Sequence, residues 1–404
     1  MNQPSHVYDV LRRLAQVAPV RLTGTRAERA LQEAVAESLH PHGYRAQWQS
    51  FRFPRHIYGS LALHFGLGLA LSIVGRVHPI VAALGLVVVA ASYYSEAVLR
   101  RHMLRRLWPA VDTQNLLMTL PASAPLRRRI VLVAHADSAF TGLLFDPRVL
   151  PLLAKPPPRW LPFLRKQLLL PWVALLAIAI YLIAGTLVPL PSWPLSLAAI
   201  PVAIVFALNA EIVLRNHAVP GAADNLSGCA ALVVLAEAWA ASPVRDVEVV
   251  FAFTGAEEAG TGGAAFLARH NEWSRSETDV IVLDTLSNGS LFLLEEGELF
   301  RMRRVDRLAT EVAAAARSLG LPTPAWYSVP AGATDALPFL LEGYDAVALS
   351  CIDASYHAPR HYHHPTDTAE MVDPVQLDAS TAIARALLTR LAGQEVGERS
   401  AAAA

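Results

Sequence analysis

The feature that most limits how this chain can fold is a long stretch without charge. From residue 168 to residue 210 there is no Asp, Glu, Lys or Arg, and Pro189, Pro191 and Pro194 interrupt the stretch near its middle. A helix that crosses a bilayer needs about 20 apolar residues, and proline marks a break between helices. We therefore expect two transmembrane helices, over residues 168–190 and 192–210. Buried helices of a soluble domain are the alternative, but they would need a polar stripe.

A second apolar region lies nearer the start of the chain. Residues 57–75 and 79–95 also lack charged side chains, although these segments are shorter and the first contains His64. Hydrophobic residues make up 53% of the chain and charged residues only 17%, against about 25% charged in a typical soluble domain. We expect four spans in two hairpins, which divide the chain at these bounds: 1–56, start of the polar domain; 57–99, first hairpin; 100–167, polar domain continued; 168–214, second hairpin; 215–393, remainder of the polar domain; 394–404, disordered tail.

Basic residues that flank the spans predict their orientation. Only Arg76 lies at the far turns, whereas the side of the polar domain carries Arg52, Arg55, Arg100, Arg101, Arg105, Arg106, Lys155, Arg159, Arg165, Lys166 and Arg215. Because cytoplasmic loops are enriched in Lys and Arg, we expect an integral membrane protein with its polar domain in the cytoplasm. The first 24 residues show no apolar core of a cleavable signal peptide.

Composition argues against nucleic-acid-binding proteins and disulfide-rich proteins. The numbers of basic and acidic residues are equal, so no nucleic-acid partner is expected. Cys229 and Cys351 are the only cysteines; they form no CxxC pair and no disulfide framework, and we expect two buried thiols.

The polar segments alternate between strand and helix patterns. Apolar or β-branched runs predict strands at 44–53, 114–120, 130–134, 247–253, 280–283, 290–294 and 346–350, and periodic runs predict helices at 7–16, 26–39, 227–240, 264–270 and 302–319. This alternation favours an α/β fold, a three-layer sandwich around a mixed sheet, interrupted by the two transmembrane hairpins.

Several of these strands end in groups that can bind metals. His135 ends the strand in VLVAHADSA, and Asp137 follows two positions later. Residues i and i+2 face the same side of an extended segment, so Asp137 can accept the free ring N–H of His135, as metal-binding histidines require. A structural histidine is the alternative.

Three further segments carry carboxylates. Asp224 lies in GAADNLSG before an apolar helix, where it either caps the helix or bridges two cations. Glu257 and Glu258 follow a buried strand, where adjacent carboxylates repel and are costly to desolvate, which favours one metal ligand and one proton-transfer group. Asp284 ends another apolar strand, and a histidine-rich loop, HYHHPTDT, comes later.

Taken in order, these motifs resemble peptidase family M28, the zinc aminopeptidases with related carboxypeptidases and glutaminyl cyclases. The resemblance covers most of the polar sequence. It rests on H-x-D at a strand end, G-x-x-D-N-x-S-G at a helix start, the E-E pair, a lone Asp after a strand and a final H-x-P-x-D-T.

The resemblance implies a role for each position. His135 and Asp284 would bind one zinc, with Asp137 supporting His135. Asp224 would bridge both ions, and Glu258 would bind the other ion together with His363, which stands four residues before Asp367. His357, His361 and His364 compete with His363. Glu257 would be the general base, and Asp335, in GATDALPF, a substrate-side or supporting residue.

The implied activity is hydrolysis of a peptide or small amide by two Zn²⁺ ions, with other divalent metals open. An aminopeptidase is expected first. A glutaminyl-cyclase-like or carboxypeptidase-like enzyme and a non-catalytic membrane receptor or transport component remain alternatives. The second hairpin separates His135 from Asp224, so we expect the site near the bilayer surface, with a hydrophobic or membrane-bound substrate. The sequence does not determine the oligomeric state.

Overall fold

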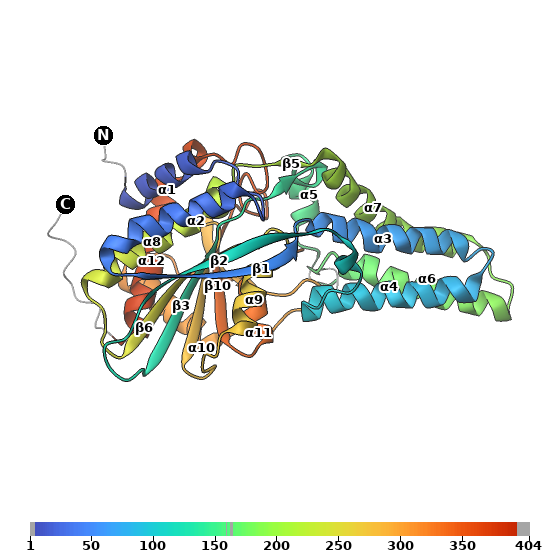
Figure 1. The fold of residues 1–404 in the computed structure, drawn as a ribbon. Coiled ribbons are helices and arrows are strands. Elements are labelled where there is room, and N and C mark those ends of the chain that lie inside the picture. Colours follow the sequence, from blue (N-terminus) through green and yellow to red (C-terminus); the bar gives the residue numbers. More distant parts are fainter. Residues whose placement is uncertain (1–4, 159, 162–164, 394–404) are drawn as a thin grey trace.

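An eight-stranded mixed sheet forms the centre of the polar part of the molecule (Figure 1). The structure is a computed structural model, and it describes residues 5–158, 160–161 and 165–393. Arg159 and the tail 394–404, for which disorder was expected, lie outside the described residues. The strand order is β1-β2-β6-β3-β7-β10-β8-β9. The strands are β1 (Arg45–Pro54), β2 (Ala110–Leu120), β3 (Arg128–His135), β6 (Val247–Thr254), β7 (Thr278–Leu283), β8 (Ser290–Glu295), β9 (Trp326–Ser328) and β10 (Asp345–Ile352).

The middle of the sheet is parallel and its flanks are mainly antiparallel. Strands β6, β3, β7 and β10 run parallel to one another, whereas β1, β2 and β8 pair in the antiparallel sense. Residues 130–135 of β3 are all buried, as expected for a strand that is covered on both faces. This arrangement brings the carboxyl ends of β3, β6 and β7 to the same edge, where α/β proteins build their sites.

Helices cover both faces of the sheet. One layer contains α1 (His6–Val17), α2 (Arg26–Leu39), α8 (Ser227–Ala241), α10 (Asp306–Ser318) and α12 (Pro374–Leu391). The opposite layer contains α9 (Gly262–His270) and α11 (Ala336–Leu341), which pack on each other. The expected α/β fold around a mixed sheet is confirmed.

Four long apolar helices project together from one side of this body (Figure 1). They are α3 (Ile57–Val74), α4 (Pro79–Leu99), α6 (Leu169–Leu187) and α7 (Trp193–Arg215), and each is long and apolar enough to cross a membrane. Helix α3 packs on α4 and α7, and α6 packs on α4 and α7. We refer to these four helices as the helical bundle.

Both hairpins of the bundle leave and re-enter the body at paired strands. The first hairpin connects β1 to β2, whose facing ends are Pro54 and Ala110. The second lies between β4 (Phe140–Thr141) and β5 (His217–Ala218), which pair with each other. Each insertion therefore replaces the loop of a β-hairpin. Because the chain ends are already held together there, the insertions leave the sheet order intact.

Two spans extend further toward the body than the sequence predicted. Helix α4 continues past residue 95 through Glu96, whose carboxylate accepts a hydrogen bond from Ser60 Oγ (2.9 Å) and pairs with Arg105 Nη1 (3.1 Å). Helix α7 continues past residue 210 through Glu211, which accepts from Arg215 Nε at 2.6 Å. The charged residues continue these helices because partners neutralise them.

The polar segments also differ from expectation in detail. Helix α10 begins at Asp306 instead of residue 302, and Met302 lies before the helix, where it donates its amide to the carbonyl of Glu296. Strand β9 was not predicted, because its three residues are too short for a period to be recognised.

Candidate metal centre

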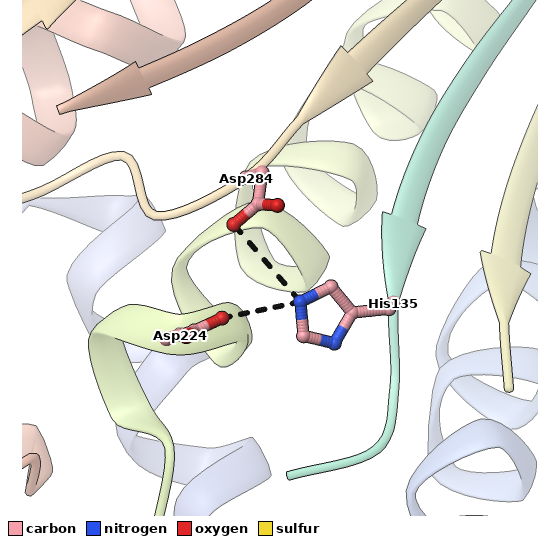
Figure 2. Close-up of side chains that lie close together, drawn as sticks. All are labelled: His135, Asp224 and Asp284. Atoms are coloured by element: carbon pink, nitrogen blue, oxygen red, sulfur yellow. Dashed lines mark hydrogen bonds and ion pairs between the residues drawn. The ribbon is translucent and has the colours of Figure 1, made fainter. Parts of the chain in front are cut away.

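The candidate site lies at the carboxyl ends of three adjacent parallel strands. His135 is the last residue of β3, Glu257 and Glu258 follow β6, and Asp284 follows β7. Figure 2 shows Asp224, from the turn before α8, and Asp284 pointing toward the ring of His135. With His363 these residues form a compact group, the ligand cluster: His135, Asp224, Glu257, Glu258, Asp284 and His363.

Asp224 stands between the two histidines. Its Oδ1 lies 3.1 Å from His135 Nε2, and its Oδ2 lies 3.3 Å from His363 Nε2. His135 Nε2 also lies 4.0 Å from Asp284 Oδ1, and His363 Nε2 lies 3.2 Å from Glu258 Oε2. The carboxylate of Asp224 therefore faces two separate groups, one with His135 and Asp284 and one with His363 and Glu258.

Three of these separations, 3.1, 3.2 and 3.3 Å, are close to those of ligands on a shared ion, and the fourth, 4.0 Å, is longer. Zinc binds nitrogen and oxygen at about 2.0–2.2 Å, which places tetrahedral ligands roughly 3.3–3.6 Å apart. Two triads, His135–Asp224–Asp284 and Asp224–Glu258–His363, hold ligand atoms within 4.8 Å of one another. A third triad, His135–Glu257–Glu258, meets the same criterion, so distance alone does not separate Glu257 from the ligands.

Of the competing histidines, His363 alone enters the cluster within the described part of the chain. Its side chain is 7% exposed. His361 and His364 are directed elsewhere, because each ring Nδ1 contacts Thr366 Oγ1, at 2.7 and 2.8 Å. His357 lines a neighbouring cavity instead.

Asp137 contacts two parts of the cluster. Its backbone carbonyl accepts from His135 Nδ1 at 3.1 Å, while its carboxylate lies 3.6 Å from that nitrogen. The carboxylate also accepts the backbone amides of Glu257 (3.0 Å) and Glu258 (3.1 Å). One buried side chain therefore fixes the loop that carries both glutamates.

The turn that carries Asp224 is held from three sides. Gly221 has a positive φ of 63°, and an added Cβ would lie 2.4 Å from the carbonyl oxygen of Asp224, so glycine is required there. The carboxylate of Asp367 accepts the amides of Ala223 (2.8 Å) and Asp224 (3.1 Å). Asn225 Nδ2 donates to the carbonyl of Leu283, next to Asp284, at 2.9 Å.

Sequence reasoning missed several of these supporting residues. It used Asp367 only as a marker for His363. It also missed Arg21, a fully buried guanidinium that donates to the carbonyls of Ala136 (2.8 Å) and Gly221 (2.9 Å). Tyr58 was missed too: its hydroxyl lies 3.0 Å from His363 Nδ1, although Tyr58 belongs to α3 of the bundle. None of these positions has a local sequence signal, because each acts on residues far away in the chain.

Asp335 is buried behind the cluster. It accepts a hydrogen bond from Thr254 Oγ1, at the end of β6, and its other oxygen has no hydrogen-bond partner among the described residues. It lines neither of the two cavities beside the cluster. Burial raises its pKa to about 7. A supporting role therefore fits Asp335 better than contact with substrate.

The electrostatics of the cluster call for a cation. Burial raises the pKa of Glu258 to about 7 and that of Asp284 to about 6, and the nearby Asp224 carboxylate adds to both shifts. Although burial opposes it, the surrounding carboxylates raise the pKa of His363 to about 10 and that of His135 well above its usual range. The carboxylates of the cluster share the positive charge of two imidazolium groups. Bound metal ions would supply this positive charge instead.

The donor set also fits zinc. It contains nitrogen and oxygen without thiolate, which is typical of open, catalytic zinc sites. Glu258 Oε1 is buried and has no hydrogen-bond partner among the described residues. A buried carboxylate oxygen without a partner is costly, and coordination would satisfy it.

The sequence itself matches a known family. A family model described as peptidase family M28 matches residues 209–388, which contain Asp224, Glu257, Glu258, Asp284 and His363. This part of the chain, which is less than half of its length, is similar to peptidase family M28. The match supports a zinc metallopeptidase. No curated protein matches the sequence.

Solved structures share the fold of this chain. Glutaminyl cyclase from Porphyromonas gingivalis is 13% identical with a TM-score of 0.56, and the match covers 96% of this chain and 99% of the cyclase. The zinc aminopeptidase BSAP from Bacillus subtilis is 12% identical with a TM-score of 0.57, over 95% and 94% of the two chains. A Zn-dependent exopeptidase from Parabacteroides distasonis is 14% identical with a TM-score of 0.55, over 96% and 97%.

Proposed function

We propose that this chain is a two-zinc exopeptidase that acts at a membrane surface, and that it is an aminopeptidase. The observation that carries the proposal is the position of Asp224, whose two oxygens face His135 and His363 at 3.1 and 3.3 Å. His135, Asp224 and Asp284 would hold one ion, and Asp224, Glu258 and His363 the other. When bound, two zinc ions supply an activated water and polarise the scissile carbonyl.

Glu257 is the residue best placed to move the proton. It lines both cavities beside the cluster, so its carboxylate faces the space where a substrate would lie. Burial raises its pKa well above the usual range, which makes the carboxylate a better base. Glu257 takes the proton of the attacking water and passes it to the leaving amine, while Asp137 holds the backbone amide of Glu257 in place.

The shape of the smaller cavity favours an exopeptidase. It has a volume of about 140 Å³ and is lined by Asp224, Glu257 and Asp284 together with Leu294 and Ile352. A cavity of roughly 150 Å³ accepts one benzene-sized group. Its volume therefore suits the side chain of a single terminal residue.

The bundle supports a location in the membrane. Its helices are long and apolar enough to cross a bilayer, and large apolar side chains on their outer faces, such as Ile80 (60%) and Ile180 (69%), are exposed. The basic residues lie at the end of the bundle that joins the polar domain, which favours a cytoplasmic catalytic domain.

The test combines metal analysis with turnover. Purified full-length protein is expected to contain two zinc ions per chain and to release free N-terminal amino acids from peptides, and a chelator should abolish that release. Glu257→Gln should retain its zinc and lose about 10²–10⁴-fold in kcat, the usual contribution of a positioned acid–base group. Full activity in this variant would refute the assignment of the base.

The fold also occurs in glutaminyl cyclases. An assay on peptides that begin with Gln separates the two reactions, because a cyclase forms pyroglutamate whereas an aminopeptidase releases glutamine. Pyroglutamate as the main product would replace the aminopeptidase proposal.

A further inference from the structure

A second, larger cavity connects the ligand cluster to the helical bundle. Its volume is about 470 Å³, within the range of pockets that bind small ligands. At one end it is lined by Glu257, Glu258 and His363. At the other end the lining is mainly apolar and comes from α3, α6 and α7: Ile57, Tyr58, Leu61, Leu170, Pro171, Pro201, Ile204, Val205, Leu208 and Asn209.

The two cavities adjoin at the site of reaction. Glu257 and His363 line both, whereas Asp224 and Asp284 line only the smaller one. A scissile bond beside Glu257 would thus join a substrate residue in the small cavity to a substrate residue in the large one. The small cavity has the volume of about one side chain, so the cavity that enters the bundle has more room for the longer part of a substrate.

The large cavity reaches the outer apolar surface of the bundle. Leu170 of α6 and Ile204 of α7 both line it, and they are 49% and 51% exposed. In an aqueous protein such exposed apolar surface indicates a binding face. Here the surface belongs to helices long and apolar enough to cross a bilayer, so in a bilayer the cavity would open toward hydrocarbon.

Polar residues are present among the apolar ones that line the cavity. Asn209 Oδ1, Thr261 Oγ1 and Arg100 Nε are buried and have no hydrogen-bond partner among the described residues. All three residues line the cavity and are at most 5% exposed. These atoms are shielded from solvent as the side chains stand, so a ligand would meet them only after the side chains rotate. A peptide brings backbone N–H and C=O groups together with apolar side chains.

We propose that the substrate is a hydrophobic peptide whose chain beyond the scissile bond lies in this cavity, and which enters from the bilayer between α6 and α7. The lining of α7 from Pro201 to Asn209 extends roughly 12 Å along the helix axis. An extended peptide covers that length with about four residues. The inference rests on the proposed function, because it places the scissile bond beside Glu257.

The experiment uses the zinc-loaded full chain in lipid nanodiscs. The probe is a peptide of about five apolar residues in which the first peptide bond is reduced to CH₂–NH and the residue before the last is a photoreactive benzoylphenylalanine. Mass spectrometry is expected to find crosslinks within α6 or α7. An unlabelled apolar peptide should compete with the probe, and a Ser- and Gln-based peptide of equal length should not.

Two variants and a matched control test the lining. Val205→Trp fills the cavity and is expected to lower crosslinking more than tenfold; Asn209→Leu removes a polar atom and should lower it severalfold. Ile200→Trp introduces the same side chain at a half-exposed position of α7 that does not line the cavity, and crosslinking should persist. Crosslinks confined to the polar domain, or equal crosslinking in all variants, would overturn the inference.

The result is separable from the proposed function because the probe is not hydrolysed. A chain that captures the probe in α6 or α7 but releases no amino acids supports the placement of the peptide and refutes the aminopeptidase proposal. A chain that cleaves soluble peptides while its crosslinks stay on the polar domain does the reverse.

Discussion

Tyr58 connects the bundle to the candidate metal centre through one hydrogen bond. Its hydroxyl lies 3.0 Å from Nδ1 of His363, the ring nitrogen that does not face Asp224. Partners of this kind fix the tautomer and orientation of a ligating histidine, and losing them typically lowers metal affinity 10–100-fold. A residue of an apolar helix thus acts on a residue far along the chain.

We therefore expect Tyr58→Phe to lower zinc affinity by about tenfold, measured by competition with a chromogenic chelator. The change removes only the hydroxyl, so packing in α3 is kept. Tyr362→Phe is the matched control, because the hydroxyl of Tyr362 makes no hydrogen bond among the described residues although its ring lies beside His363. Equal affinity in both variants would contradict the role given to Tyr58.

Glu296 predicts a pH dependence of stability. Burial raises its pKa to about 7 from an ordinary value of 4.5, even though Thr334 donates two hydrogen bonds to the carboxylate. Between about pH 4.5 and 7 the folded protein keeps a proton that the unfolded chain has released. The contribution of Glu296 to stability is therefore complete below pH 4.5 and is lost as the pH rises through 7.

In Glu296→Gln this loss is expected to disappear. The variant should unfold at a higher temperature than the wild type at pH 8 and at nearly the same temperature at pH 5, as measured by thermal unfolding in detergent. Glu33→Gln, at an exposed position of α2, should follow the wild type at both values. A gain that is equal at pH 5 and pH 8 would show that ionisation of Glu296 is not the cause.

At the level of elements, the sequence predicted most strands and helices and the residues that follow the strands. Those predictions depended on local patterns, such as the apolar run that leads into His135. The ends of α4 and α7 were placed too early, because Glu96 and Glu211 stay helical only through partners. Asn225 and Asp367 hold the turn of Asp224, but the sequence did not predict this role. Their contacts join segments that are far apart in sequence, so no local pattern reveals them.

Arg105 joins the first hairpin to the loop that carries Glu257 and Glu258. Its guanidinium is fully buried, pairs with Glu96 of α4 at 3.1 Å, and donates to the carbonyls of Pro54 and Ala259, the latter next to Glu258. Arg105→Met would leave the Glu96 carboxylate buried without its charged partner, which typically costs about 3–5 kcal/mol. We expect lower thermal stability together with lower activity.

A double-variant cycle separates this pair from general damage. Glu96→Gln in the Arg105→Met background should recover part of the lost stability, because it removes the unpaired charge. If the two changes were simply additive in the free energy of unfolding, the ion pair would not be the link between hairpin and loop.

At the scale of the whole molecule, each hairpin is inserted where two paired strands already meet, so the sheet and the bundle coexist in one chain. The orientation of this assembly follows from its charges. The far turn of the second hairpin, near Ser192, carries no charge, whereas basic residues gather beside the polar domain. If cytoplasmic loops hold the basic residues, Ser192 faces outward and the polar domain faces inward.

Single engineered cysteines test that orientation. Cys229 and Cys351 give little background, because both are buried and burial raises their pKa to about 11 and about 12, which keeps the thiols unreactive. In spheroplasts, a membrane-impermeant maleimide is expected to label Ser192→Cys but not Ser276→Cys, which lies on the exposed surface of the polar domain. After lysis both should react. Labelling of Ser276→Cys in intact spheroplasts would place the catalytic domain outside, and the peptides available to it would then come from the opposite side of the membrane.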